Sequence, residues 1–253
     1  MTGRLTIVGL GPGDEDLLTP RAGDALAAAT DLVGYLPYVA RIPERPGQRR
    51  HASDNRQEIE RAREALRLAA SGRTVAVVSS GDPGVFAMAA AVFEAIEHGE
   101  PAWRELEVEV VPGVSAMFAA AARLGAPLGH DFCALSLSDN LKPWDVVLER
   151  LTASATAGFV IALYNPISRA RPWQLGAALD CLRHILPPTT PVAFARAISR
   201  PDERIVITDL ENAAPDAADM STLVLIGSAQ TRRIERASGE PWLYTPRRLE
   251  ASS

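Results

Sequence analysis

The segment 74–87, TVAVVSSGDPGVFA, constrains the fold more than any other part of the chain. Its β-branched run ends abruptly in Ser-Ser-Gly-Asp-Pro-Gly, and apolar residues at helical spacing begin at Val85. This pattern predicts a buried strand, a tight turn and the start of a helix. In α/β proteins, ligands bind at such carboxyl ends of strands, and small residues let a ligand approach the backbone. An ordinary turn capped by Asp82 explains the same residues equally well.

The same alternation of strands and helices continues through the first half of the chain. Strands are expected at 5–10, 32–35 and 106–111, and helices at 20–30, 54–70 and 114–124. Residues 41–51 contain two prolines and no periodicity, which predicts a loop. Strands that alternate with helices predict a parallel sheet with right-handed crossovers.

The second half has a different order of elements. Strands are expected at 132–138, 159–163, 191–199, 204–210 and 221–227, with helices at 143–154 and 171–186. Only residues 200–203 separate two of these strands, so they should form an antiparallel hairpin within a mixed sheet. We therefore expect an α/β protein with domains at 1–115 and 116–242 and a tail at 243–253.

Composition excludes several classes of protein. The net charge of −5 over 253 residues argues against nucleic acid as a general partner, because phosphate binding needs surplus cations. Two cysteines make no disulfide framework, so a cytoplasmic location is expected. The longest apolar stretch, 114–129, contains Arg123 and Pro127, and the amino-terminal apolar run is short. Neither a membrane span nor a secretion signal is therefore expected.

The segment 9–14, GLGPGD, resembles a dinucleotide-binding turn but departs from it at two positions. Asp14 stands where the third glycine belongs, and Pro12 lacks an N–H that a pyrophosphate would use. The chain also has no phosphate loop ending in Gly-Lys-Ser/Thr and no Gly-x-Ser-x-Gly elbow. Nicotinamide binding, nucleotide hydrolysis and serine hydrolase chemistry are therefore poorly supported.

Two Cys/His pairs and one basic segment each allow two interpretations. His130 with Cys133, and Cys181 with His184, have a spacing that some zinc sites use, although core cysteines beside surface histidines explain the pairs without a metal. We expect no metal site. The basic segment 41–51 is either a solvated loop or a clamp for a polycarboxylate, which guanidinium groups bind well.

Taken together, three segments of the first half resemble the tetrapyrrole methylase superfamily of S-adenosylmethionine-dependent methyltransferases. They are GLGPGDEDLLT (9–19), SSGDPGVFAMA (79–89) and VVPGVSA (110–116). In the second half, LGAPLGHDFCALSLSD (124–139), LYNPISRAR (163–171) and STLVLIGS (221–228) resemble one branch of that family. That branch methylates C-17 of precorrin-3B and contracts the macrocycle to precorrin-4 in cobalamin biosynthesis. The resemblance covers residues 5–231.

The resemblance implies two αβα domains, with S-adenosylmethionine bound in a cleft between them and released as S-adenosylhomocysteine. The family holds this cofactor mainly through backbone groups of loops, and a ligand without phosphate tolerates the proline and acids of these turns. Asp82 could bind the ribose hydroxyls. The implied cofactor contacts are Gly11, Pro12, Ser80, Gly81, Asp82, Val85, Ser115, Ala116, Tyr164, Asn165, Ala193, Ile226 and Gly227.

The implied reaction needs positioning for methyl transfer and a proton donor for ring contraction. The candidates for catalysis are Asp14, His130, Asp131 and Asp139, each of which could instead be a cap or a core hydrogen-bond partner. Candidate contacts to substrate carboxylates are Arg41, Arg45, Arg49, Arg50, Lys142 and Arg196. The implied partners are a small-molecule tetrapyrrole and a second copy of the chain. Two alternatives are a sister methylase acting on a cobalt-containing substrate or another ring carbon, and a non-catalytic tetrapyrrole carrier.

Overall fold

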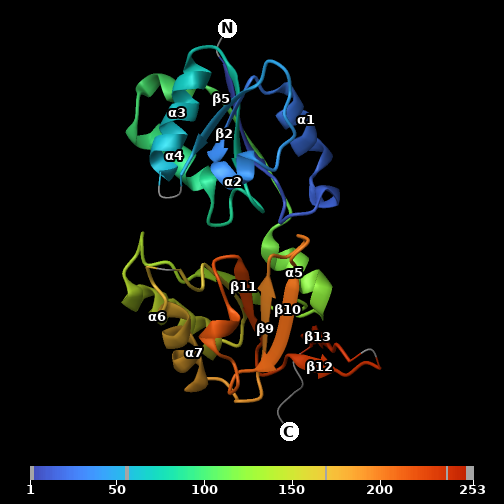
Figure 1. Cartoon of the computed structure of the whole chain (residues 1–253). Coiled ribbons are helices and arrows are strands. Elements are labelled where there is room, and N and C mark those ends of the chain that lie inside the picture. The colour runs from blue at the N-terminus through green and yellow to red at the C-terminus, as the bar shows by residue number, and fades with distance from the viewer. Residues whose placement is uncertain (1–2, 55–56, 169, 238, 249–253) are drawn as a thin grey trace. The chain divides into compact units, whose positions relative to one another are not determined.

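A computed structural model describes residues 3–54, 57–168, 170–237 and 239–248 (Figure 1). The chain divides into two compact units, Met1–Ser115 and Ala116–Ser253. Each unit has its own sheet and its own hydrophobic core.

The first unit is built on a five-stranded sheet in the order β3-β2-β4-β1-β5, and every neighbouring pair is parallel. The prediction of a parallel sheet is therefore confirmed. The strands are β1 (Arg4–Gly9), β2 (Asp31–Tyr35), β3 (Arg49–Ser53), β4 (Thr74–Ser79) and β5 (Glu107–Val111).

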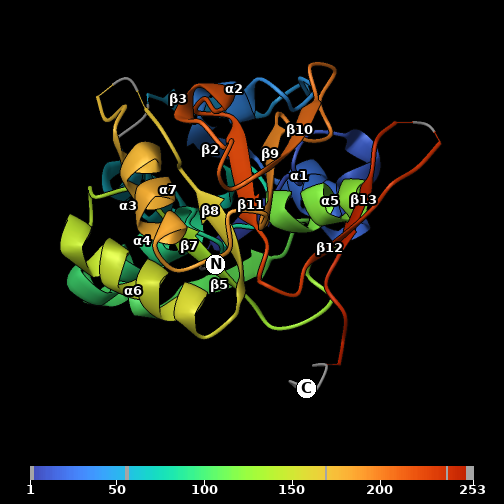
Figure 2. The same ribbon diagram turned by 90° about the horizontal axis from the view of Figure 1, so that it is seen from below.

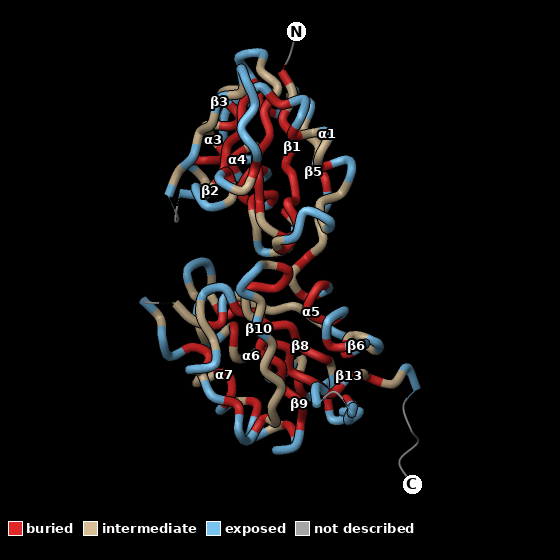
Figure 3. The backbone as a smooth tube through the Cα atoms, turned by 45° about the vertical axis from the view of Figure 1, so that its right-hand side comes forward, coloured by how far each residue is buried: buried red, intermediate tan, exposed pale blue. Residues whose placement is uncertain are grey.

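Helices cover both faces of this sheet. On one face, α1 (Pro20–Ala28) and α2 (Leu36–Val39) pack on alternate strand residues such as Val8 and Val78. On the other, α3 (Glu58–Ala70) and α4 (Met88–His98) pack on Ile7 and Val77 (Figure 1). The 3₁₀ helices η1 (Glu15–Leu17) and η2 (Pro101–Glu105) complete the unit. The central strands are buried along most of their length (Figure 3), as expected of a parallel sheet covered on both faces.

Two local predictions for the first unit are wrong. Residues 49–53 form β3 rather than a loop, because RRHAS is a polar strand at the sheet edge and shows no apolar alternation. The helix expected from Val85 starts only at Met88. The intervening residues form a turn in which Phe86 has a left-handed φ of 52° and is half-exposed.

The second unit is built on a mixed sheet in the order β10-β9-β11-β8-β7. The strands are β7 (Phe132–Ser136), β8 (Val160–Tyr164), β9 (Pro191–Arg196), β10 (Arg204–Asp209) and β11 (Thr222–Ile226). β7 and β8 are parallel, whereas β9 and β10 form the expected antiparallel hairpin with Arg196 opposite Arg204. Because β11 is antiparallel to both β8 and β9, the carboxyl ends of β7, β8 and β9 lie at one end of the sheet. We call this the carboxyl end.

Helices α6 (Trp144–Thr156) and α7 (Gln174–Arg183) pack on one face of the second sheet, and α5 (Ala116–Leu124) contacts β11 on the other side (Figure 2). A small sheet of β12 (Arg232–Ile234), β13 (Trp242–Tyr244) and β6 (Gly125–Ala126) was not expected, because strands of two or three residues show no periodicity. Leu243 and Tyr244 belong to β13, and Leu243 is buried, so this part of the expected tail is structured. The remaining element is η3 (Pro215–Ala217). Within the described residues, every helix is too short or too polar to cross a membrane.

Candidate functional site

The loops that follow β1 and β4 are joined at two glycines. The N–H of Gly11 donates to the carbonyl of Gly81 (3.2 Å), and the N–H of Gly81 donates back to that of Gly11 (2.9 Å). Both residues have left-handed φ angles, 68° and 65°, which favour glycine. The bridge therefore fixes these two loops against each other by backbone alone.

The loop after β5 approaches the same point equally closely. A Cβ added to Gly113 would lie 2.3 Å from the carbonyl oxygen of Gly81, and one added to Gly9 would lie 2.6 Å from the Gly113 nitrogen. Because these neighbours are backbone atoms, they cannot move aside as a side chain can. Four glycines thus allow three strand ends to meet at one point. We call Gly9, Gly11, Gly81 and Gly113 the glycine cradle.

Asp82 holds the cradle together. One of its carboxylate oxygens accepts the N–H of Gly84 (2.8 Å), and the other accepts the N–H of Gly113 (3.1 Å). The side chain therefore links the loop after β4 to the loop after β5. These two hydrogen bonds support the interpretation of Asp82 as the cap of a turn. Contact between Asp82 and the ribose of the cofactor remains a prediction.

Arg41 and Arg50, two of the candidate contacts to substrate carboxylates, donate from their guanidinium groups to backbone carbonyls of the protein. Arg41 donates to the carbonyls of residues 10, 11 and 13 at 3.3–3.5 Å and to the hydroxyl of Ser80 at 3.4 Å. Arg50 donates to the carbonyls of residues 39 and 42, at the end of α2. Arg41 therefore supports the loop that carries Gly11, and only Arg45 and Arg49 present exposed side chains to solvent.

The other candidates of the first unit lie around these loops. Asp14 is exposed and accepts the N–H of Asp16 at 3.0 Å, so it caps η1, as its alternative interpretation proposed. Pro12 and Ser115 are buried, and Val85 is partly buried. Ala116 is the first residue of α5.

His51, from the basic segment, lies in a buried ionic cluster away from the cradle. Its Nε2 lies 2.8 Å from a carboxylate oxygen of Asp31, which is fully buried and also accepts hydrogen bonds from Arg73 and Thr30. Burial by itself would raise the pKa of Asp31, but the hydrogen bonds from these three partners outweigh it and lower that pKa. This cluster joins β2 to β3 and β4, and we assign it to stability.

At the carboxyl end of the second sheet, two strand-end loops meet. Asn165 has a left-handed φ of 51° and donates from Nδ2 to the hydroxyl of Ser136 (2.9 Å). The Tyr164 hydroxyl accepts the N–H of Met117 (3.2 Å) in the first turn of α5. The structure therefore brings Tyr164 and Asn165 together, with side chains fixed by protein contacts.

Asp139 lies at this same end, paired with two residues that the sequence analysis did not select. Its Oδ1 is 3.1 Å from Nη1 of Arg171 and accepts a hydrogen bond from Nε2 of the buried Gln174 (2.9 Å). Arg171 and Gln174 therefore fix the position of the Asp139 side chain at this end of the sheet. Arg171 is the last residue of LYNPISRAR, one of the segments that resemble the family. Its place in that segment is the sequence feature that could have marked it as a functional residue.

Several candidates of the second unit lie elsewhere. Gly227 donates its N–H to the carbonyl of Pro191 at the opposite end of the sheet, and Ile226 lies beside it with its side chain in the core. Ala193 is fully buried in the middle of β9. The structure therefore does not gather these three with Tyr164.

His130 and Asp131 directly precede β7, so they lie at the end of the second sheet opposite to the carboxyl end with Tyr164. The Asp131 carbonyl accepts the N–H of Val160, and His130 Nδ1 lies 3.6 Å from Asp131 Oδ2. Of the catalytic candidates in this unit, Asp139 alone lies at the carboxyl end.

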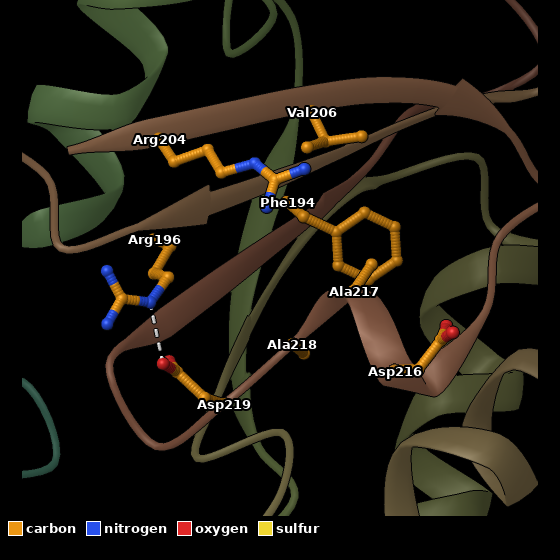
Figure 4. A pocket seen from close by; sticks show the side chains of 8 residues that line it. All are labelled: Phe194, Arg196, Arg204, Val206, Asp216, Ala217, Ala218 and Asp219. Atoms are coloured by element: carbon orange, nitrogen blue, oxygen red, sulfur yellow. Dashed lines mark hydrogen bonds and ion pairs between the residues drawn. The ribbon is translucent and has the colours of Figure 1, made fainter. Parts of the chain in front are cut away.

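Arg196 lies at the edge of a cavity of about 440 Å³ (Figure 4). Its Nε donates to Asp219 (2.7 Å) and its Nη1 to Asp202 (2.8 Å), and these two hydrogen bonds raise the pKa of Arg196. Its charge is therefore already compensated. The cavity is lined by Phe194, Arg196, Arg204, Val206, Asp216, Ala217, Ala218 and Asp219.

Neither cysteine lies in a metal site among the described residues. No group of three or more potential ligand side chains occurs in that part of the chain. Cys133 and Cys181 are both free and half-buried, and burial raises the pKa of the Cys133 thiol. Cys181 lies 3.4 Å from the hydroxyl of Thr152.

Comparison with known proteins identifies the relatives of this chain. A precorrin-3B C(17)-methyltransferase of Sinorhizobium is 58% identical over 98% of this chain and 97% of its own length. A probable cobalt-factor III C(17)-methyltransferase of Salmonella typhimurium is 39% identical over 90% of this chain and 93% of its own length.

Two solved structures have the same fold. The methyltransferase CobJ has a TM-score of 0.92 and 53% identity, covering 96% of this chain and all of the other. The uroporphyrin-III C-methyl transferase of Thermus thermophilus, solved with S-adenyl homocysteine, has a TM-score of 0.67 and 28% identity over 90% of this chain and 98% of the other. The family model of the tetrapyrrole (corrin/porphyrin) methylases matches residues 4–214. The chain therefore belongs to the tetrapyrrole methylase family.

Proposed function

We propose that this protein is an S-adenosylmethionine-dependent methyltransferase that methylates C-17 of precorrin-3B and contracts the ring to give precorrin-4 in cobalamin biosynthesis. The observation that carries the proposal is the 58% identity, over almost the whole of both chains, to a precorrin-3B C(17)-methyltransferase. The intact glycine cradle and the Asp139–Arg171–Gln174 cluster are consistent with it.

The loops of the first unit suit this cofactor. They contain no lysine that could bind a phosphate, Pro12 contributes no N–H donor, and Asp14 and Asp82 add negative charge. Such a site disfavours phosphate but accepts an uncharged nucleoside next to a cationic sulfonium. When bound, S-adenosylmethionine supplies the methyl group to be transferred. We retain as its contacts Gly11, Pro12, Ser80, Gly81, Val85, Ser115, Ala116, Tyr164 and Asn165, with Asp82 holding the loops in place.

The chain's own part in methyl transfer is to position the substrate and exclude water. Backbone groups fixed by the Gly11–Gly81 bridge need no rearrangement on binding, which reduces the entropic cost of binding. For ring contraction, we propose Asp139 as the group that relays a proton to the substrate, with Arg171 positioning it. Arg45, Arg49 and Lys142 remain the proposed contacts to substrate carboxylates.

The test is incubation of the purified protein with precorrin-3B and S-adenosylmethionine that carries a ¹³C-methyl group. We expect one labelled methyl at C-17 and the absorption spectrum of a ring-contracted product. Tight pigment binding without methyl transfer would instead support the non-catalytic carrier.

A cobalt-containing substrate is the second candidate, because a relative at 39% identity bears the name of a cobalt-factor III enzyme. Parallel reactions with cobalt-factor III distinguish the two substrates. The higher identity to the precorrin-3B enzyme leads us to expect that kcat/KM favours the metal-free substrate.

We further propose that the protein acts in the cytoplasm as a homodimer. Two free, half-buried cysteines are consistent with a reducing compartment. Sedimentation equilibrium tests the dimer, with a species of twice 27.1 kDa expected.

A further inference from the structure

Two loops at the carboxyl end of the second sheet are tied into one surface. They are the β7–α6 loop (137–143) and the β8–α7 loop (165–173, of which 169 lies outside the described residues). Arg171 bonds to both Asp139 and the side chain of Asn140. The rings of Trp144 and Trp173 pack edge to face with their centroids 4.8 Å apart. These contacts hold the two loops in a defined arrangement.

This surface presents large apolar side chains to solvent. Leu141 is 91% exposed, the largest exposure among the exposed hydrophobic side chains of the described residues. Trp173 is 46% exposed and lies at the start of α7. Both side chains belong to loops that the Arg171 contacts and the Trp144–Trp173 pair join, and exposed apolar groups gathered in this way commonly mark a binding surface. Because the carboxyl ends of β7 and β8 meet here, this is also where α/β sheets bind their ligands.

The side chain that follows Leu141 in the same loop is a lysine, Lys142. Lys142 is the single lysine of the chain, and among the described residues no carboxylate lies within ion-pair distance of it. Partial burial and the nearby Arg150 both lower the pKa of Lys142, because each disfavours its charged form. An anion bound at this amine would relieve both effects. Arg171, in contrast, is already paired with Asp139.

We propose that Leu141, Lys142 and Trp173 form the contact surface for the tetrapyrrole substrate, with the apolar side chains against the macrocycle and the Lys142 ammonium on one carboxylate arm. The inference rests on the proposed function for the identity of the ligand. A flat apolar ring that carries carboxylates complements two apolar side chains beside a lysine that makes no ion pair within the described part of the chain. A protein segment or a second copy of the chain would cover the same apolar groups without requiring the amine.

The first test measures binding of precorrin-3B by quenching of tryptophan fluorescence, together with KM in the methylation assay. Leu141→Ser should raise Kd about 10-fold, because burial of a leucine side chain is lost. Lys142→Gln should raise it about 5-fold, as for loss of one partly exposed ion pair. The affinity for S-adenosylhomocysteine should stay unchanged in both. Ile234→Ser, which removes another half-exposed apolar side chain of this unit, is the matched control and should leave precorrin-3B binding unaltered.

The second test uses the single lysine directly. Limited acylation with an amine-reactive ester can label only Lys142 and the terminal α-amine, and peptide mass spectrometry separates the two. Precorrin-3B should slow labelling of Lys142 at least 5-fold and leave the α-amine unchanged. Equal labelling with and without precorrin-3B, together with wild-type Kd in Leu141→Ser, would overturn the inference.

The two proposals fail in distinguishable ways. If the wild-type protein converts precorrin-3B but the variants bind and react normally, the proposed function stands and this surface is not the substrate site. If wild-type protein neither binds nor converts precorrin-3B, both proposals are wrong. Conversion of a dimer to a monomer by Leu141→Ser would assign the surface to self-association and contradict the inference.

Discussion

The glycine cradle makes a quantitative prediction through Gly113→Ala. An added Cβ would lie 2.3 Å from the carbonyl oxygen of Gly81 and 3.0 Å from Cα of Gly9. Ordinary contacts of this kind lie near 3.4 Å or beyond, so the backbone must separate by about 1 Å. Gly113 itself has no left-handed φ, so the cost of the substitution is steric rather than conformational.

Overpacking of this kind costs about 1–3 kcal/mol, and the absence of a flexible neighbour places Gly113→Ala toward the upper value. The displaced loop would also strain the hydrogen bond from Gly113 to Asp82. We therefore expect the free energy of unfolding to fall by about 2–3 kcal/mol and the affinity for S-adenosylhomocysteine to fall with it. Urea denaturation and isothermal titration calorimetry measure the two quantities.

The matched control is Gly23→Ala, in the middle of α1. A Cβ at Gly23 meets no atom within 4 Å, and alanine is favoured over glycine in a helix by about 1 kcal/mol. This variant should gain stability and bind S-adenosylhomocysteine normally. If Gly113→Ala is as stable as the wild-type protein and binds equally well, the close approach of the three loops is refuted.

Three further predictions follow from contacts in the two units. Asp31→Asn should lower the free energy of unfolding at pH 7 by about 3–5 kcal/mol, because it breaks a buried ionic cluster. Since the folded-state pKa of Asp31 is lowered, its stabilisation is present above pH 3.8 and is lost as the pH falls through the folded value. Urea denaturation of the wild-type protein between pH 5 and pH 2.5 should show this loss, and Asp31→Asn should lack it. Arg41→Ala should lower the free energy of unfolding by about 1–2 kcal/mol, because it removes donors to loop carbonyls. The exposed control Arg45→Ala should change this free energy by less than about 0.5 kcal/mol. Equal effects of the two variants in thermal unfolding would refute the role given to Arg41. Tyr164→Phe should lower the free energy of unfolding by about 1 kcal/mol, because the N–H of Met117 loses its acceptor. An unchanged melting temperature would contradict a stabilising role for this hydrogen bond.

Sequence periodicity alone predicts those helices and strands in which buried positions recur regularly along the chain. The parallel pairing of the first sheet and the β9–β10 hairpin follow from runs of apolar residues and from the length of the connections. Thr19 and Pro20 also mark the start of α1, where Thr19 Oγ1 accepts the N–H of Ala22. These features depend on local order along the chain.

Other features depend on contacts between distant residues and leave little trace in the sequence. β3 is a polar strand at the edge of its sheet, and β6, β12 and β13 are too short to show a period. The acidic and basic candidates were selected by residue type. Type alone cannot show that Arg50 caps a helix, or that His130 lies at the opposite end of the sheet from Tyr164.

This chain should transfer a methyl group to C-17 and contract the macrocycle in one reaction. The decisive experiment follows the conversion of precorrin-3B with ¹³C-methyl S-adenosylmethionine, using mass spectrometry and carbon NMR of the isolated product. We expect one labelled methyl per macrocycle, located at C-17, in a ring-contracted product. A label on another ring carbon, or recovery of unchanged precorrin-3B with active cofactor, would contradict it.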